Sequence, residues 1–188
     1  MEIKPRDIVK CNEGKNNKIA FVFSCPGQEE LNSEKLVFGQ TGRNLESLLE
    51  ELKRRDFIKE DFKDRYDFTI TNSYNKVHYK GYLDKNDKRT EPLLSEVRTS
   101  ENIERLTTEL KEAEIIICFG KRPKIALEIC KNNLKARVLY SRHLGLQSLN
   151  QINEDINGNK LTKGKEGNTD KRIQVVAQEL IDQYNQSK

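Results

Sequence analysis

One histidine and one asparagine stand at the ends of predicted strands, where their side chains can reach a ligand. His143 follows the predicted strand 136–140, and Asn72 is the last residue of the predicted strand 66–72. An imidazole exchanges protons near neutral pH, and a carboxamide offers both a donor and an acceptor that can read a base edge. The alternatives are a structural or exposed histidine and an asparagine that caps a turn. The strand-end position of His143 favours the functional interpretation.

A second group of candidates follows the apolar run IAFVF, in the segment SCPGQEE at residues 24–30. The Pro26-Gly27 turn needs no room for a side chain, so neighbouring backbone N–H groups are free to hold a base or a phosphate. Glu29 and Glu30 either favour the start of a helical turn or supply a general base. Phe38, in LVFGQTG, is either a loop anchor in the core or a platform for a flat ligand.

The hydrophobic pattern predicts strands and helices in alternation. Continuous apolar runs are typical of strands covered on both faces, and leucines spaced i, i+3, i+4, i+7 are typical of a helix. Thr41 is the expected N-cap of the first helix. The predicted strands are 19–23, 66–72, 114–119 and 136–140, the predicted helices are 41–55, 100–113, 122–132 and 169–184, and 80–95 is a predicted loop.

This alternation predicts a single α/β domain over residues 1–188, with a core at about 18–150 and a C-terminal helix at 169–184. The expected architecture is a three-layer α/β/α arrangement around a mostly parallel, four-stranded sheet. Ligands of such sheets bind at the carboxyl ends of the strands. The segments that follow the four strands are therefore expected to form the site.

Composition narrows the classes of function. The chain of 188 residues carries 34 Lys and Arg against 30 Asp and Glu, a net charge of +4 that permits an anionic partner without requiring one. Its four cysteines form no CxxC pair, so no metal site is expected. P-loop, GxGxxG and GxSxG motifs are absent, which disfavours kinases, dinucleotide-dependent oxidoreductases and serine hydrolases. No apolar stretch approaches a membrane span, and we expect a cytoplasmic protein.

The order of the strand-end motifs resembles the uracil-DNA glycosylase superfamily. The superfamily has a GEAPG motif, then PFVGxxG and a leucine-rich helix, then a strand that ends in TN, a strand that ends in Gly with its helix, and finally HPS. The corresponding segments stand here in the same order: SCPGQEE, VFGQTG, NLESLLEEL, TITN, IIICFG with its helix, and HLGLQS. The resemblance spans about residues 18–150. It implies a uracil-DNA glycosylase-like fold and hydrolysis of the N-glycosidic bond of uracil or a related damaged base in DNA, after the base is flipped out.

The resemblance also implies roles for individual residues. His143 would donate to the departing base, Asn72 would read it and Phe38 would stack on it. For the attacking water, Gln28, Glu29 and Glu30 are the local candidates. Ser24 or Gln28 would orient this water weakly, or another residue would take the role. Cys25, Pro26 and Gly27 would hold the base through the backbone, Lys76 and Arg142 would contact DNA, and Leu146 or Gln147 would fill the hole left by the flipped base.

Several positions depart from the superfamily pattern. Ser24 stands where the water-positioning glutamate is expected, and Cys25 where other branches have an asparagine. Val37 stands at the usual stacking phenylalanine. The cluster-binding cysteines are missing, so no iron–sulfur cluster and no other cofactor are expected. The alternative is therefore a catalytically weak or inactive module that binds a base, a nucleotide or DNA; a generic α/β protein of unrelated function is a third interpretation.

Overall fold

Four parallel strands form the centre of the structure, a computed structural model that describes residues 7–186. They are β1 (Asn16–Phe23), β2 (Phe68–Asn72), β3 (Ile115–Phe119) and β4 (Arg137–Ser141). Their order across the sheet is β2-β1-β3-β4, and every neighbouring pair is parallel. The predicted α/β class and the parallel, four-stranded sheet are confirmed.

The two central strands are those with the longest apolar runs. In β1, Phe21 and Phe23 face one layer of helices, while Ala20 and Val22 face the other, and all four side chains are buried. In a strand covered on both faces every side chain is buried, because successive side chains point to opposite faces, so an unbroken apolar sequence stabilises it. This is why IAFVF and IIICF occupy the middle of the sheet.

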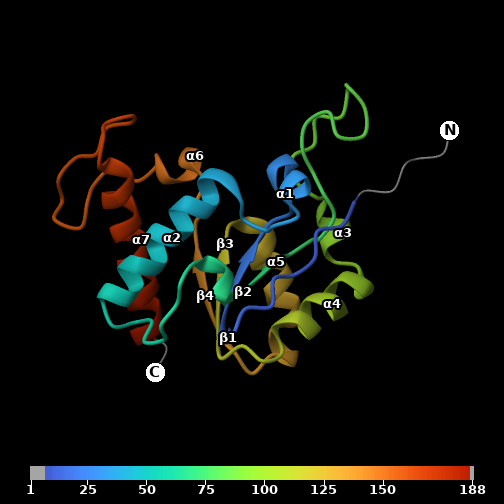
Figure 1. The fold of residues 1–188 in the computed structure, drawn as a ribbon, viewed down its shortest axis with the longest axis horizontal. Coiled ribbons are helices and arrows are strands. Elements are labelled where there is room, and N and C mark those ends of the chain that lie inside the picture. The colour runs from blue at the N-terminus through green and yellow to red at the C-terminus, as the bar shows by residue number, and fades with distance from the viewer. Residues whose placement is uncertain (1–6, 187–188) are drawn as a thin grey trace.

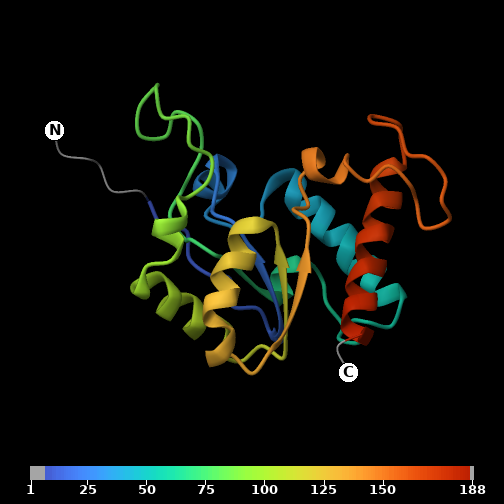
Figure 2. The ribbon, with the colours of Figure 1, turned by 180° about the vertical axis from the view of Figure 1, so that it is seen from behind.

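Two helices cover each face of the sheet (Figures 1 and 2). On one face, leucines of α2 pack with Ile173, Val176 and Leu180 of α7. On the other face, Leu106 and Leu110 of α4 pack with residues of α5. The helices are α2 (Gly39–Arg54), α7 (Asn168–Gln186), α4 (Ser100–Leu110) and α5 (Lys121–Cys130).

The start of α2 differs from the prediction. The helix begins at Gly39 with Phe38 as its N-cap, so the expectation that Thr41 caps it is wrong. Thr41 lies inside the first turn instead. The leucine periodicity located helix α2 correctly. The first turn of the helix holds no buried leucine, so the periodicity could not predict where the helix begins.

Short elements gather at the edge of the sheet where the strands end (Figure 1). They are α1 (Gln28–Ser33), α3 (Leu94–Val97) and α6 (Leu146–Leu149), with 3₁₀ turns elsewhere at Arg65–Asp67 and Lys131–Asn133. Residues 79–93, called the 79–93 loop below, rise beside α1 at this edge without helix or strand. None of the helices within residues 7–186 has the length and apolar character that crossing a membrane requires.

Candidate functional site

A cavity of about 170 Å³ opens at the carboxyl edge of the sheet. For comparison, an engineered apolar cavity of about 150 Å³ holds one benzene molecule. This cavity is therefore of the size of a single ring, but most of its lining is polar. It is lined by Phe23, Ser24, Cys25, Gly27, Glu30, Val37, Thr41, Asn72, His78, Thr90 and His143.

The structure brings most of the predicted catalytic and base-binding residues to this cavity. Residues from the turn after β1, from the end of β2 and from the loop after β4 meet there, as the rule for parallel sheets predicts. The six predicted residues that line it are Ser24, Cys25, Gly27, Glu30, Asn72 and His143. Three others do not line it: Pro26 is buried behind the turn, Gln28 is exposed on α1, and Phe38 lies outside.

The expectation that Phe38 forms the stacking face is not met by its position. Its side chain is 44% exposed, and Val37 lines the cavity in its place. Val37 is buried and has a backbone φ of 52°, a left-handed conformation that is unfavourable for a β-branched residue. Such strain persists only where the surrounding structure enforces it, and it is frequent at functional sites. The strained backbone turns Val37 inward and Phe38 outward.

His143 is held as a neutral imidazole. The backbone N–H of Gly145 donates to its Nδ1 at 2.9 Å, so Nδ1 is an acceptor and the ring proton resides on Nε2. Burial lowers the pKa of His143, and the carboxylate of Glu91 opposes this shift only in part. The ring also meets the ring of Phe23 edge to face, with centroids 6.3 Å apart. His143 therefore presents an N–H donor from Nε2 at neutral pH.

Asn72 offers its whole amide to the cavity. The residue is 3% exposed, and its carboxamide has no hydrogen bond to any residue within 7–186. Its backbone carbonyl, by contrast, accepts a hydrogen bond from Arg105 at 2.9 Å. Because the amide lines the cavity without a hydrogen bond inside the described part of the chain, its donor and its acceptor are available to a polar ligand.

Ser24, which directly follows β1, and Glu30 of α1 add two further polar groups to the lining. Ser24 is 7% exposed, and its buried Oγ has no hydrogen-bond partner in the described part of the chain. The Glu30 carboxylate accepts a hydrogen bond from the Gly27 N–H at 3.0 Å. Burial raises the pKa of Glu30, and this effect outweighs the backbone hydrogen bonds that lower it. A carboxyl whose pKa is raised in a cavity is a candidate general base.

The 79–93 loop contributes a wall that sequence reasoning did not predict. Thr90 lines the cavity, and its carbonyl accepts a weak hydrogen bond from Cys25 Sγ at 3.6 Å. Glu91 forms an ion pair with Arg122 at 3.4 Å, and Arg89 lies 3.4 Å from Glu96. These contacts join the loop to the turn after β1, to α5 and to α3. The turn-rich composition of the loop gave no sign of this position.

His78 is another cavity residue that the sequence did not predict. Its side chain is fully buried, its Nδ1 lies 3.0 Å from the carbonyl of Lys76, and its Nε2 lies 3.9 Å from Glu96. Because a carbonyl only accepts, Nδ1 carries a proton. The available signal was composition: the chain has only two histidines, and the structure places both at one cavity.

The predicted DNA-contacting residues have mixed placements. Leu146 is 43% exposed at the start of α6, three residues after His143, and Gln147 is exposed beside it. Arg142 lies 3.8 Å from Glu179 of α7 in an ion pair. Lys76 lies away from the cavity lining, with its Nζ 6.0 Å from the centroid of the Tyr74 ring.

A search of protein-family models and of curated proteins found no match to this chain. The resemblance to the uracil-DNA glycosylase superfamily therefore depends on the order of the motifs given above. Residues 7–186 contain no group of three or more His, Cys, Asp or Glu side chains placed to hold a metal ion.

Proposed function

We propose that this protein is a uracil-DNA glycosylase-like enzyme that releases uracil or a related damaged base from DNA. The observation that carries the proposal is that Asn72 and His143 line the same ring-sized cavity. The Asn72 amide has no hydrogen-bond partner among residues 7–186, and His143 carries its proton on Nε2. Those groups match the polar edge of a single base. An enzyme that acts on a base in DNA must first take it out of the stack and into such a pocket.

The chemistry assigned to His143 is donation to the leaving base. When the bond between the sugar C1′ and the base nitrogen breaks, the base departs with the electron pair and carries negative charge on its oxygen. A neutral imidazole N–H aimed at that oxygen stabilises charge where it develops. The hydrogen bond from Gly145 to Nδ1 keeps the proton on Nε2, and burial keeps a second proton off the ring.

Glu30 is the group best suited to activate the water. Its carboxylate lines the cavity, and its raised pKa makes it a stronger base than an exposed glutamate. In this mechanism the water oxygen bonds to C1′, its proton passes to Glu30, and the base anion then takes a proton from solvent. The hydroxyl of Ser24 would hold the same water. Glu30 thereby replaces the glutamate that the superfamily pattern expects at position 24.

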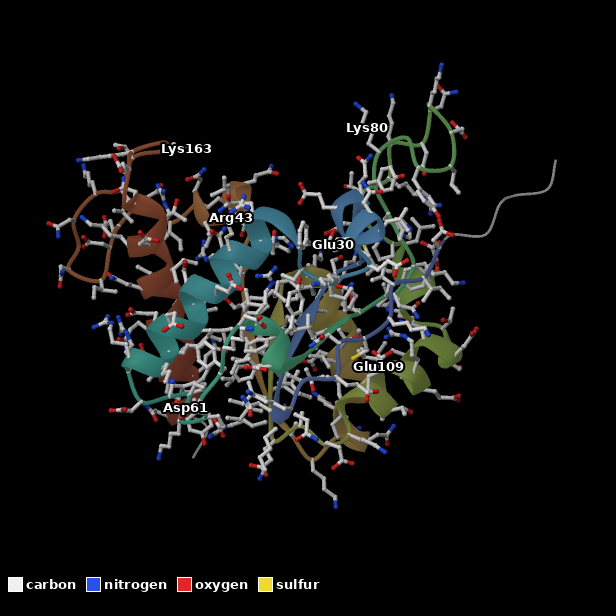
Figure 3. The ribbon with its side chains drawn as sticks, in the orientation of Figure 1. Glu30, Arg43, Asp61, Lys80, Glu109 and Lys163 are labelled. Atoms are coloured by element: carbon white, nitrogen blue, oxygen red, sulfur yellow. The ribbon has the colours of Figure 1, made fainter. Side chains whose placement is uncertain are left out.

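Positive charge at the end of the molecule that holds the cavity supports DNA as the substrate. Figure 3 shows Lys80, Arg43 and Lys163 at the same end of the molecule as Glu30, with Asp61 at the opposite end. Lys80, Lys85 and Lys88 of the 79–93 loop are exposed and form no ion pair within residues 7–186. Unpaired cations at the mouth of a site attract a polyanion, whereas paired ones contribute little.

The alternative is a module of the same fold that binds a base, a nucleotide or DNA without cutting. The observation that favours it is Ser24, because a serine cannot act as a general base on its own. Both functions require the same cavity, so binding alone does not separate them.

The deciding experiment is a base-release assay. The purified protein is incubated with labelled single- and double-stranded oligonucleotides that contain uracil, hypoxanthine or xanthine, and strand scission is measured after treatment with alkali. Scission that falls by about 10²-fold or more in His143→Ala and in Glu30→Gln supports the enzyme. Binding without scission, measured by fluorescence anisotropy, supports the non-catalytic module. Absence of both scission and binding would overturn the proposal.

A further inference from the structure

Helix α4, which covers the sheet face opposite α2, holds the end of β2 at three successive residues. Thr71 Oγ1 donates a hydrogen bond to Glu109, and Arg105 Nη2 donates to the carbonyl of Asn72 at 2.9 Å. Asn102 Nδ2 donates to the carbonyl of Ser73 at 2.7 Å. None of these three α4 residues lines the cavity.

This arrangement is rigid because the α4 residues also hold one another. Arg105 forms an ion pair with Glu109, and Asn102 Oδ1 accepts hydrogen bonds from Arg105 Nη2 at 2.9 Å and Nε at 3.3 Å. The Arg105 and Glu109 side chains are only 19% and 17% exposed. The planar guanidinium thus bonds a strand end and two helix side chains at once, which a lysine ammonium cannot reproduce.

The opposite side of the same backbone is held by β1. The N–H of Ser73 donates to the carbonyl of Phe23 at 2.7 Å, and the N–H of Tyr74 donates to the carbonyl of Ser24 at 3.1 Å. The peptide group between Asn72 and Ser73 is therefore fixed at its carbonyl by α4 and at its N–H by β1. The direction of the Asn72 amide, which has no side-chain partner among residues 7–186, depends on that peptide plane.

We propose that Arg105 is a positioning residue that aims the Asn72 amide into the cavity and so sets which base the cavity accepts. The effect on base choice rests on the function proposed above, whereas the effect on the Asn72 amide does not. A displacement of about 1 Å in a catalytic site costs as much as 10²-fold in rate, so removing the Arg105 hydrogen bond lowers both turnover and discrimination.

The test is Arg105→Lys, with Arg55→Lys as the matched control. Arg55 also forms an i,i+4 ion pair, with Glu51, and its side chain is 17% exposed. Arg55 directly follows α2 and contacts Gln178 of α7 but no residue that lines the cavity. Both substitutions remove a guanidinium from a half-buried ion pair, so they should lower the melting temperature by similar amounts.

The direct measurement is the pair of side-chain NH₂ signals of Asn72 in a ¹⁵N-correlated NMR spectrum, assigned with Asn72→Asp. We expect these signals to shift in Arg105→Lys and to stay in place in Arg55→Lys. The kinetic measurement is kcat/KM for release of the preferred base and of a competing base. We expect a loss of tenfold or more for the preferred base, with a smaller ratio between the two bases, in Arg105→Lys alone.

Unchanged Asn72 signals in folded Arg105→Lys would overturn the positioning role, whether or not the protein releases a base. A wild-type protein that neither binds nor releases a base would overturn the proposed function while the amide signals still report on Arg105. If Arg105→Lys does not fold, Glu109→Gln serves instead, because it removes the ion pair of Arg105 and leaves its hydrogen bonds to Asn72 and Asn102. The same signals are then expected to shift by less, and the absence of any shift counts against the role.

Discussion

Glu30 shows how the demands of folding and of chemistry oppose each other at a single residue. Burial raises its pKa, so the folded protein binds the proton of this carboxyl more tightly than the unfolded chain does. The ionised form, which the proposed mechanism needs, therefore destabilises the fold at neutral pH. That cost falls away as the pH drops through the raised pKa and the carboxyl becomes protonated.

Replacing Glu30 by glutamine should consequently stabilise the protein and weaken catalysis. The amide oxygen of Glu30→Gln can still accept the Gly27 N–H, and each 1 kcal/mol relieved raises the melting temperature by about 2–4 °C in a chain of this size. Base release should fall by about 10²-fold or more, the usual contribution of a general base. Calorimetry at pH 7 and pH 5 checks the first part: the gain over wild type must shrink at the lower pH. An equal gain at both values would contradict this account.

The pH dependence of base release follows from the same pKa direction. Release requires Glu30 ionised and His143 neutral. The acid limb of log kcat/KM should lie above the pKa of about 4.3 of an ordinary glutamate, because burial raises the pKa of Glu30. Burial lowers the pKa of His143, so protonation of His143 acts only at the acid end. A rate profile measured from pH 4 to pH 8 tests this, and in Glu30→Gln the residual rate should lack the Glu30 limb.

Gly145 is needed beside His143 for reasons of space. Its φ of −68° and ψ of 150° suit any residue, but a Cβ there would lie 2.9 Å from His143 Nδ1. Gly145→Ala should therefore displace the imidazole and lower base release by about tenfold or more with little change in stability. Kinetics together with the melting temperature check this, with Ser148→Ala in the adjoining helix α6 as the control. Full activity in Gly145→Ala would show that the imidazole position is not critical.

At the scale of elements, the first turn of α2 packs unusually close to the strained segment before it. A Cβ at Gly42 would lie 2.1 Å from the carbonyl oxygen of Val37. This oxygen belongs to the backbone, so the clash cannot be relieved by rotating a side chain. This close approach lies beside the left-handed backbone of Val37, which lines one wall of the cavity.

Gly42→Ala should for this reason destabilise the protein although alanine is the better helix former. Alanine in an open helical site gains about 1 kcal/mol over glycine, whereas overpacking costs about 1–3 kcal/mol. Denaturant unfolding measures the difference, and Ser47→Ala, at an exposed position of the same helix, should be neutral or slightly stabilising. A stabilised Gly42→Ala protein would mean that the turn has room to move.

For the whole molecule, the distribution of paired and unpaired cations predicts where a polyanion binds. Replacing Lys80, Lys85 and Lys88 by glutamate should weaken DNA binding. The slope of log K against log salt concentration should fall in magnitude by about 0.9 for each phosphate that these lysines no longer neutralise. The control is the same change at Lys59, Lys63 and Lys135, which are exposed near the amino ends of the strands, away from the cavity, and likewise form no ion pair within residues 7–186. Fluorescence anisotropy at several salt concentrations checks this; equally weakened binding in both triple variants would show that only net charge matters.

The sequence alone determined the sheet and the neighbourhood of the site. Unbroken runs such as IAFVF and IIICF, in alternation with helices, are typical of a parallel sheet covered on both faces, and the carboxyl ends of parallel strands meet at one edge. This local pattern was enough to predict that Ser24, Asn72 and His143 approach one another. The predicted bounds of the strands differ from the observed ones by a few residues at most, because the apolar runs end where burial ends.

Tertiary structure alone decided which side chains face the cavity. Val37 rather than Phe38 lines the cavity, where its backbone is left-handed, and no sequence period encodes that. His78 reaches the cavity from the segment that follows β2, and Thr90 reaches it from the 79–93 loop, whose composition is polar and irregular. Arg105 reaches Asn72 from 33 positions away along the chain. Apolar periodicity records what is buried within one element, whereas these contacts depend on how separate elements pack together.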